Sequence, residues 1–407
     1  MAKPLLAADP ARLSLPPLAE GEEVRADGPR VAQALAGKVQ RMGPFFGLLG
    51  SADIRGRGSD SENSPHCDPF MLCHTGSLPP GAKPPFCAHP HCGASVATIS
   101  VTGSKMSPWD NVQGTEAKPL LPGGIYHVQT GSGCVHDEPM DPIDVTPRTR
   151  AGFGDGGASV AQPGGPSQLM QLWWNSIDPA LPAGSPLPGV RTQVLLPEEV
   201  PVVACGDLRV RVLAGDFGGN ANVLTSAAYP ILLLHVLVPA GADGELTGLP
   251  AEFNGFMWLW EGAVTVGDGD DALLTAYGDE GMRRLPPGGT SLRLRGATGE
   301  GAADAELLVA LGMPQRKPYY KYVGYGGGFI HRTVEEVEAA MADYESNPKQ
   351  YGCAVAGSSG CPEEDLQRFD LVGGFQDNGG EMMERPDGIV ARFAYAPAPE
   401  QEPEPEL

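Results

Sequence analysis

Four residues on two predicted strands have the types and the spacing of metal ligands. One residue separates His89 from His91, and one residue separates His136 from Glu138. Because successive side chains of an extended strand point to opposite faces, each pair shares a face of its strand. Two adjacent strands would then present three imidazoles and one carboxylate to a single point. We interpret this pattern as a metal site.

The donor set limits the choice of metal. Neutral imidazoles and a carboxylate suit a borderline divalent ion such as iron, manganese, nickel or copper, and four protein ligands leave an octahedral ion open to exogenous ligands. Zinc is the alternative, because Cys87 and Cys92 flank the two histidines, although no Cys-x-x-Cys element accompanies them. A lone histidine is more often a core or surface residue, but two spaced pairs with glycines close by favour a site.

The composition indicates a large acidic globular chain. Its 407 residues predict two or three domains, and its hydrophobic content of 41% is sufficient for substantial cores. The formal charge of -22 disfavours binding to nucleic acid or to an anionic membrane, so we expect proteins or small molecules as partners. The apolar run Ile231–Val238 is too short to span a bilayer and predicts a buried strand.

The cysteines and the two ends of the chain favour an intracellular protein. A long chain with eight cysteines and no secretory signal is expected to keep reduced thiols and to be cytoplasmic, nuclear or both. Cys353 and Cys361 could pair only under oxidation. Residues 1–37 are expected to form a disordered arm, and residues 351–407 an acidic tail of low order.

Short strand patterns recur in both halves of the chain. In LMQLWWN, Gln171 and Trp173 share a face by spacing, so they could line the cavity that holds the ligands, although an aromatic residue on a strand is more often core. The second half has strands at all-β spacing but only one histidine, His235, which we expect to be a hydrogen-bonded core residue. Its alternating Phe256, Trp258 and Trp260 predict a barrel interior or a domain interface.

A helix is predicted after the second set of strands. Thr333 and Glu336 have the spacing of a capping box, in which each side chain satisfies a backbone donor of the other residue. Apolar residues follow at helical spacing, so this should be an amphipathic closing helix that docks by one face.

Five segments together resemble the pirins, a two-barrel family of the cupin superfamily. They are DPFML from Asp68, HPHCG from His89, TGSGCVHDE ending at Glu138, LMQLWWN, and GGGFIHRTVEEVEAAMADY ending at Tyr344. The resemblance implies an all-β bicupin with a metal-binding barrel over residues 38–190 and a metal-free barrel with the closing helix over residues 191–350. It also implies a single Fe(II), or another divalent metal, held by His89, His91, His136 and Glu138.

The resemblance implies two different functions. The leading hypothesis is a monomeric non-haem iron enzyme of the quercetin 2,3-dioxygenase type, which takes a flavonol-like substrate and O2, with Glu138 as catalytic base and Gln171 and Trp173 as substrate-binding residues. The alternatives are an iron-dependent redox sensor that assists transcription-related proteins, and a degenerate bicupin. The pirin pattern has arginine, an aromatic residue and glutamate where this chain has Cys92, Ala94 and Ser95, so the surroundings of the ligands differ.

Overall fold

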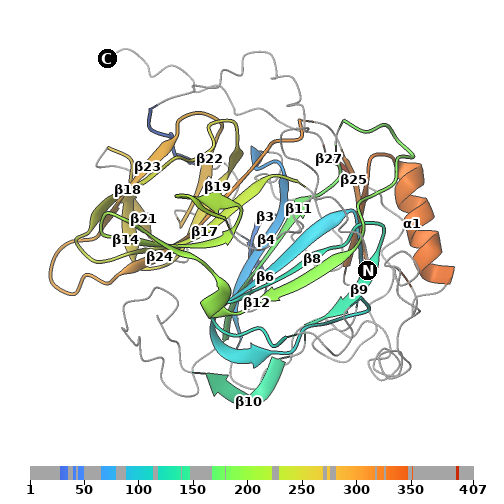
Figure 1. Ribbon diagram of the computed structural model, residues 1–407, viewed down its shortest axis with the longest axis horizontal. Helices are drawn as coiled ribbons and strands as arrows, with labels where there is room; N and C mark the ends of the chain where they lie inside the picture. The colour runs from blue at the N-terminus through green and yellow to red at the C-terminus, as the bar shows by residue number, and fades with distance from the viewer. Residues whose placement is uncertain are drawn as a thin grey trace.

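Two β-barrels lie side by side, and one α-helix packs on the outer side of the first barrel (Figure 1). The computed structural model describes residues 28–34, 40–42, 45–49, 66–78, 89–112, 118–138, 140–146, 167–178, 180–221, 229–268, 273–275, 281–316, 319–324, 327–346, 351 and 391–393. The expected all-β, two-barrel fold with a short C-terminal helix is confirmed.

The first barrel is formed by two facing sheets. The larger has the order β12-β8-β6-β11-β4-β3-β2, with β10 paired to β6: Arg191–Leu195, Ile125–Gln129, Ala94–Met106, Ser167–Asn175, Phe70–Leu78, Phe45–Leu49, Gln40–Met42 and Met140–Thr146. The smaller has the order β27-β25-β26-β5-β9-β7: Ala391–Phe393, Tyr319–Gly324, Gly327–His331, His89–Cys92, Cys134–Asp137 and Trp109–Asp110.

The second barrel also has a large and a small sheet. The large sheet has the order β1-β22-β19-β24-β17-β14-β13: Gln33–Ala34, Met282–Leu285, Asn254–Glu261, Ala305–Gly312, Ile231–Val238, Leu208–Ala214 and Val202–Cys205. The small sheet has the order β18-β23-β20-β21: Asp243–Thr247, Ser291–Gly296, Ala263–Val266 and Leu273–Thr275. A separate hairpin pairs β15 (Asp216–Phe217) with β16 (Asn220–Ala221).

The large sheets of the two barrels pack against each other through an apolar interface. All eight residues of β17 are buried, because alternate side chains enter either the core of the second barrel, as Leu234 does, or the interface, as Leu233 does. Trp258 and Trp260 also lie in the interface, and Phe256 meets Phe70 of the first barrel edge-to-face at 5.5 Å. The alternating aromatic residues of β19 therefore form a barrel interface rather than a barrel interior.

Part of the arm that we expected to be disordered is structured. Strand β1 pairs with β22, and the buried Arg30 donates from Nη1 to the carbonyls of Phe253 at 2.8 Å and Pro286 at 2.6 Å. These bonds place residues 28–34 on the second barrel, which corrects the prediction of disorder for them. Residues 1–27, and the acidic tail apart from Tyr351 and β27, lie outside the described residues.

The predicted capping box is present at α1 (Val334–Ser346). The Glu336 amide donates to Thr333 Oγ1 at 3.2 Å, and the Thr333 amide donates to Glu336 Oε2 at 3.1 Å. The buried face of the helix, which includes Val337 and Met341, packs on β26. Because β26 pairs in parallel with β5, this segment extends a sheet of the first barrel, whereas the sequence predicts that it closes the second.

Candidate metal centre

Strands β5 and β9 bring the three predicted histidines together. They pair in antiparallel register, with His89 opposite His136 and His91 opposite Cys134. Residues directly opposed across such a pair point to the same face, and so do residues two apart on one strand. All three imidazoles consequently lie on one face, as the alternation in the sequence predicted.

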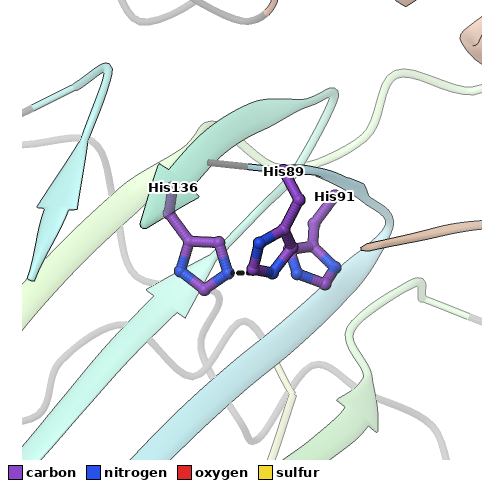
Figure 2. Close-up of side chains that lie close together, drawn as sticks. All are labelled: His89, His91 and His136. Carbon is purple, nitrogen blue, oxygen red and sulfur yellow. Dashed lines mark hydrogen bonds between the residues drawn. The ribbon is translucent and has the colours of Figure 1, made fainter. Parts of the chain in front are cut away.

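The three rings form a compact cluster (Figure 2). His89 Nε2 lies 3.0 Å from His136 Nε2, and one potential ligand atom from each of His89, His91 and His136 lies within 4.8 Å of the others. Within the described part of the chain, this is the one group of three or more potential ligands at such distances. An ion placed among the rings could take three nitrogen ligands.

The electrostatics of the cluster suit a metal ion. Burial, together with the neighbouring imidazoles, holds the pKa values of His91 and His136 well below the usual range, so the rings are neutral. A metal ligand must offer such an unprotonated nitrogen. Neither ring nitrogen of His91, nor Nδ1 of His136, has a hydrogen-bond partner among the described residues. Buried nitrogens without partners are costly unless a ligand satisfies them, so these residues fit a metal ion.

Aromatic residues place the cluster between the two sheets of the first barrel. The indole of Trp173 on β11 meets His91 edge-on, with ring centroids 4.7 Å apart. The ring of Tyr126 on β8 stacks over His136 at 6.0 Å, and its hydroxyl donates to Asp110 Oδ2 at 3.3 Å. The candidate centre thus faces the inside of the barrel, where a ligand would be shielded from bulk water.

Glu138 lies at the same wall of the barrel but outside the group of three histidines. Strand β9 ends at Asp137, and Oε2 of Glu138 accepts a hydrogen bond from Gln171 Nε2 at 2.9 Å. Burial raises the pKa of Glu138 to about 7, against the lowering effect of the hydrogen bond from Gln171. The structure therefore brings Glu138 and the predicted substrate-binding Gln171 into contact. The role of Glu138 as fourth ligand stays a prediction.

A row of polar residues crosses this wall. Gln171 on β11 is opposite His74 on β4 and Thr98 on β6, and Thr98 is opposite Tyr126 on β8. Opposed residues share a face, so the four side chains line the inside of the barrel at one level. Further along β6, the Ser100 hydroxyl is buried and has no hydrogen-bond partner among the described residues. His74 and Thr98 were not singled out in the sequence because isolated polar residues carry no local signal.

The inside of the second barrel has a different character. Its core consists of buried aliphatic and other apolar residues, among them Leu234, Val236, Leu259, Leu307 and Val309. The isolated His235 faces the interface and bonds Glu306 Oε2 at 3.1 Å, as expected for a hydrogen-bonded core histidine. The first barrel is therefore built with polar side chains on its inner face where the second is packed with apolar ones.

Cys92 is not part of the three-histidine cluster, which argues against the zinc alternative. It follows His91 directly, so its side chain points to the other face of β5 and joins the apolar cluster under α1. Its Sγ atom lies 3.3 Å from Nε2 of His331. The sequence did not single out His331, because a contact between residues 239 positions apart leaves no local pattern. Cys87 lies outside the described residues.

The fold and the three-histidine cluster define an all-β bicupin with a candidate metal centre in its first barrel. No protein-family model matches the sequence, and no curated protein sequence matches it. Similar folds occur in two solved structures of quercetin 2,3-dioxygenase from Acinetobacter baumannii. One is 20% identical, with a TM-score of 0.57, over 78% of this chain and 98% of that one; the other is 16% identical, with a TM-score of 0.55, over 78% and 88%.

A structure of the bacterial pirin YhhW from Escherichia coli in complex with nickel(II) is also similar, at 12% identity and a TM-score of 0.44 over 70% of this chain and 97% of that one. The two dioxygenase structures establish the bicupin fold, whereas a fold alone does not determine a reaction. In the part of the chain that the structure describes, no helix is long and apolar enough to cross a membrane.

Proposed function

We propose that this protein is a mononuclear non-haem iron oxygenase of the quercetin 2,3-dioxygenase type, acting on a flavonol-like substrate and O2. One observation carries the proposal: three buried imidazoles face the inside of a barrel, next to a carboxylate held by an amide, and those of His91 and His136 are neutral and have nitrogens without a hydrogen-bond partner among the described residues. The two dioxygenases with the same fold support the choice of reaction class. The described residues of the second barrel offer no comparable group.

The residues of the candidate metal centre have specific roles in this proposal. His89, His91 and His136 would hold the metal, with Glu138 as a fourth ligand or as the base that accepts the proton of the substrate hydroxyl. Gln171 fixes the Glu138 carboxylate through its Nε2 atom, at 2.9 Å. When bound, a redox-active divalent ion supplies a Lewis acid for the hydroxyl and electrons for the reaction with O2.

The binding of the flat substrate would rest on the wall of the barrel. Trp173 lies edge-on to His91 and offers an apolar surface beside the metal, while its Nε1 has no hydrogen-bond partner among the described residues. Thr98 and Ser100 add hydroxyls on the same inner face. A flavonol has a flat aromatic body with hydroxyl groups at its edge. It therefore fits a site that combines an indole with separate polar atoms.

The test is turnover by the reconstituted protein. Anaerobically purified protein is loaded with ferrous iron, and quercetin absorbance is followed together with oxygen uptake. We expect metal-dependent loss of both, and loss of turnover in His136→Ala with the fold retained by circular dichroism. The matched control is His127→Phe, since His127 is equally buried but lies on the outer face of β8 against Trp174. Unchanged turnover in His136→Ala would end the proposal.

The other two functions have weaker support. A redox-sensing role toward transcription-related proteins rests on the pirin resemblance and on the acidic charge of -22. A partner that binds the ferrous, ferric and metal-free forms equally would contradict it. A degenerate bicupin predicts the absence of stoichiometric metal binding. The presence of three fitted imidazoles favours the oxygenase over this last reading.

A further inference from the structure

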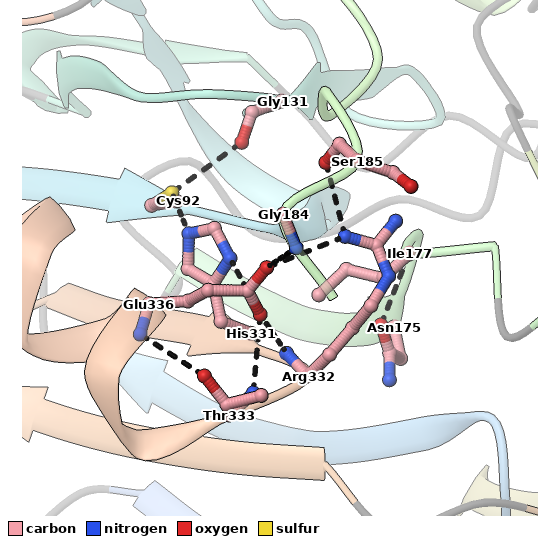
Figure 3. Close-up of polar contacts among 10 residues, drawn as sticks. All are labelled: Cys92, Gly131, Asn175, Ile177, Gly184, Ser185, His331, Arg332, Thr333 and Glu336. Atoms are coloured by element: carbon pink, nitrogen blue, oxygen red, sulfur yellow. Dashed lines mark hydrogen bonds and ion pairs between the residues drawn. The ribbon is translucent and has the colours of Figure 1, made fainter. Parts of the chain in front are cut away.

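Three polar residues form a chain on the side of β5 that faces away from the three imidazoles. Cys92 Sγ lies 3.3 Å from His331 Nε2 and 3.5 Å from the carbonyl oxygen of Gly131. The other ring nitrogen of His331, Nδ1, lies 3.8 Å from Glu336 Oε2. A thiol, an imidazole and a carboxylate thus follow one another from β5 through the end of β26 to α1 (Figure 3).

Glu336 is the point at which this chain of contacts is anchored. Its Oε2 atom accepts the backbone amides of Arg332 and Thr333, both at 3.1 Å. Its Oε1 atom accepts the amide of Gly184 at 2.6 Å, which attaches the loop before β12. One carboxylate thereby holds the start of α1, the end of β26 and a loop of the first barrel in a fixed relation to His331.

The backbone beside His91 is closely packed against β26 and Trp173. β26 pairs with β5 so that Gly328 is opposite His91. A Cβ atom on Gly328 would lie 2.8 Å from Cζ3 of Trp173, whose ring touches His91. A Cβ atom on Gly93 would lie 1.9 Å from the Ile330 carbonyl oxygen. A shift of β26 must therefore be transmitted to β5 or to Trp173, because close-packed interiors pass displacement on to their neighbours.

We propose that His331 and Glu336 are positioning residues of the metal centre. They set the position of β5, through Cys92 and the pairing with β26, and so determine how His89 and His91 converge on the ion. The inference rests on the metal centre of the proposed function and is independent of the substrate. Groups outside the ligand shell commonly change metal affinity by 10- to 100-fold, and this indirect route should act at the lower end of that range.

Cobalt(II) is a suitable probe, since its visible absorption reports ligand geometry without any turnover. The full-length protein is loaded with cobalt, and its spectrum and its affinity in competition with a chelator are compared with those of His331→Phe and Glu336→Gln. We expect shifted absorption bands and an affinity lower by about tenfold in both variants. His331→Gln, which keeps a side-chain amide able to reach Cys92, should recover part of the loss.

The control is Leu307→Ala, which removes a buried side chain from the core of the second barrel, away from β5, β26 and α1. It should lower the melting temperature while leaving the cobalt spectrum as in the wild type. Wild-type bands and affinity in His331→Phe, or equal changes in Leu307→Ala, would overturn the positioning role. If the wild type binds neither cobalt nor iron, the proposed metal centre is wrong and this inference is wrong with it. That result is distinguishable from one in which the wild type binds metal but His331→Phe has no effect.

Discussion

The imidazole Nε2 of His235 lies 3.1 Å from Oε2 of Glu306 in the buried interface between the barrels. Trp260 donates its indole N–H to the same oxygen at 3.4 Å, and Arg211 is opposite His235 on the neighbouring strand. Burial lowers the pKa of Arg211 to about 10, while the charge of Glu306 raises it. A charged cluster is therefore enclosed by the apolar contact between the two large sheets.

Removal of the carboxylate from this cluster should be strongly destabilising. Glu306→Ala removes the acceptor of His235 and Trp260 together with the carboxylate charge that acts on the buried Arg211, and breaking a buried charged network costs about 3–5 kcal/mol. The free energy of unfolding in urea measures the loss. Asp243→Ala, which removes an exposed partner of Arg293, is the control and should change little. Equal effects of the two substitutions would show that the cluster does not stabilise the interface.

Stability should fall on acidification partly because of His127. Its ring stacks on Trp174, with the ring centroids 4.9 Å apart and an angle of 8° between the ring planes. Burial lowers the pKa of His127 to about 3. The unfolded histidine titrates near its ordinary value of about 6.5, so the unfolded chain binds the extra proton first. The contribution of His127 to the free energy of unfolding is complete above about pH 6.5 and is lost as the pH falls toward 3. His127→Phe should show a shallower decline of the urea midpoint; parallel curves would refute this.

Gly93 should not tolerate a side chain, for reasons of space as well as conformation. Its φ is +76°, and an added Cβ would meet the Ile330 carbonyl oxygen at 1.9 Å. Gly241 has nearly the same φ, +74°, with nothing within 4 Å of an added Cβ. We expect Gly241→Ala to cost about 1–2 kcal/mol of unfolding free energy and Gly93→Ala substantially more. Similar costs would show that β26 can retreat from β5.

Metal binding should stabilise the folded chain. An ion that binds only the native state adds about 2.7 kcal/mol at a free concentration one hundred times its Kd. Thermal unfolding with and without ferrous or cobalt ion measures the effect. His91→Ala should lose it, whereas His127→Phe, at a buried histidine outside the cluster, should keep it. Equal stabilisation of the His91→Ala protein would place the ion elsewhere.

Local patterns in the sequence accounted for the cluster but not for what surrounds it. Alternation placed His89, His91 and His136 on one face, because side-chain direction in a strand depends only on position. The Glu138 carboxylate also lies on the inner side of the barrel, where it accepts a hydrogen bond from Gln171, although β9 ends at Asp137 and the group of three histidines does not include it. Its distance from the imidazoles depends on the backbone after the strand, which alternation does not predict.

Contacts between distant segments could not be predicted from local sequence patterns either. The capping box at Thr333 was predicted because its residues are three apart, whereas the contact of Cys92 with His331 depends on how the second barrel returns its chain to the first. Arg30 likewise finds carbonyl partners more than two hundred positions away, so the order of residues 28–34 could not be anticipated from their composition.

The pairing of β5 with β26 has a consequence for biosynthesis. Cys92 and His331 are 239 residues apart, so a ribosome adding about 5–20 residues per second separates their appearance by roughly 10–50 s. During this interval β5 has its neighbour β9 but not β26. A nascent first barrel thus carries all three histidines while one edge of their sheet is uncovered, and β26 can cover that edge only after the second barrel has been translated.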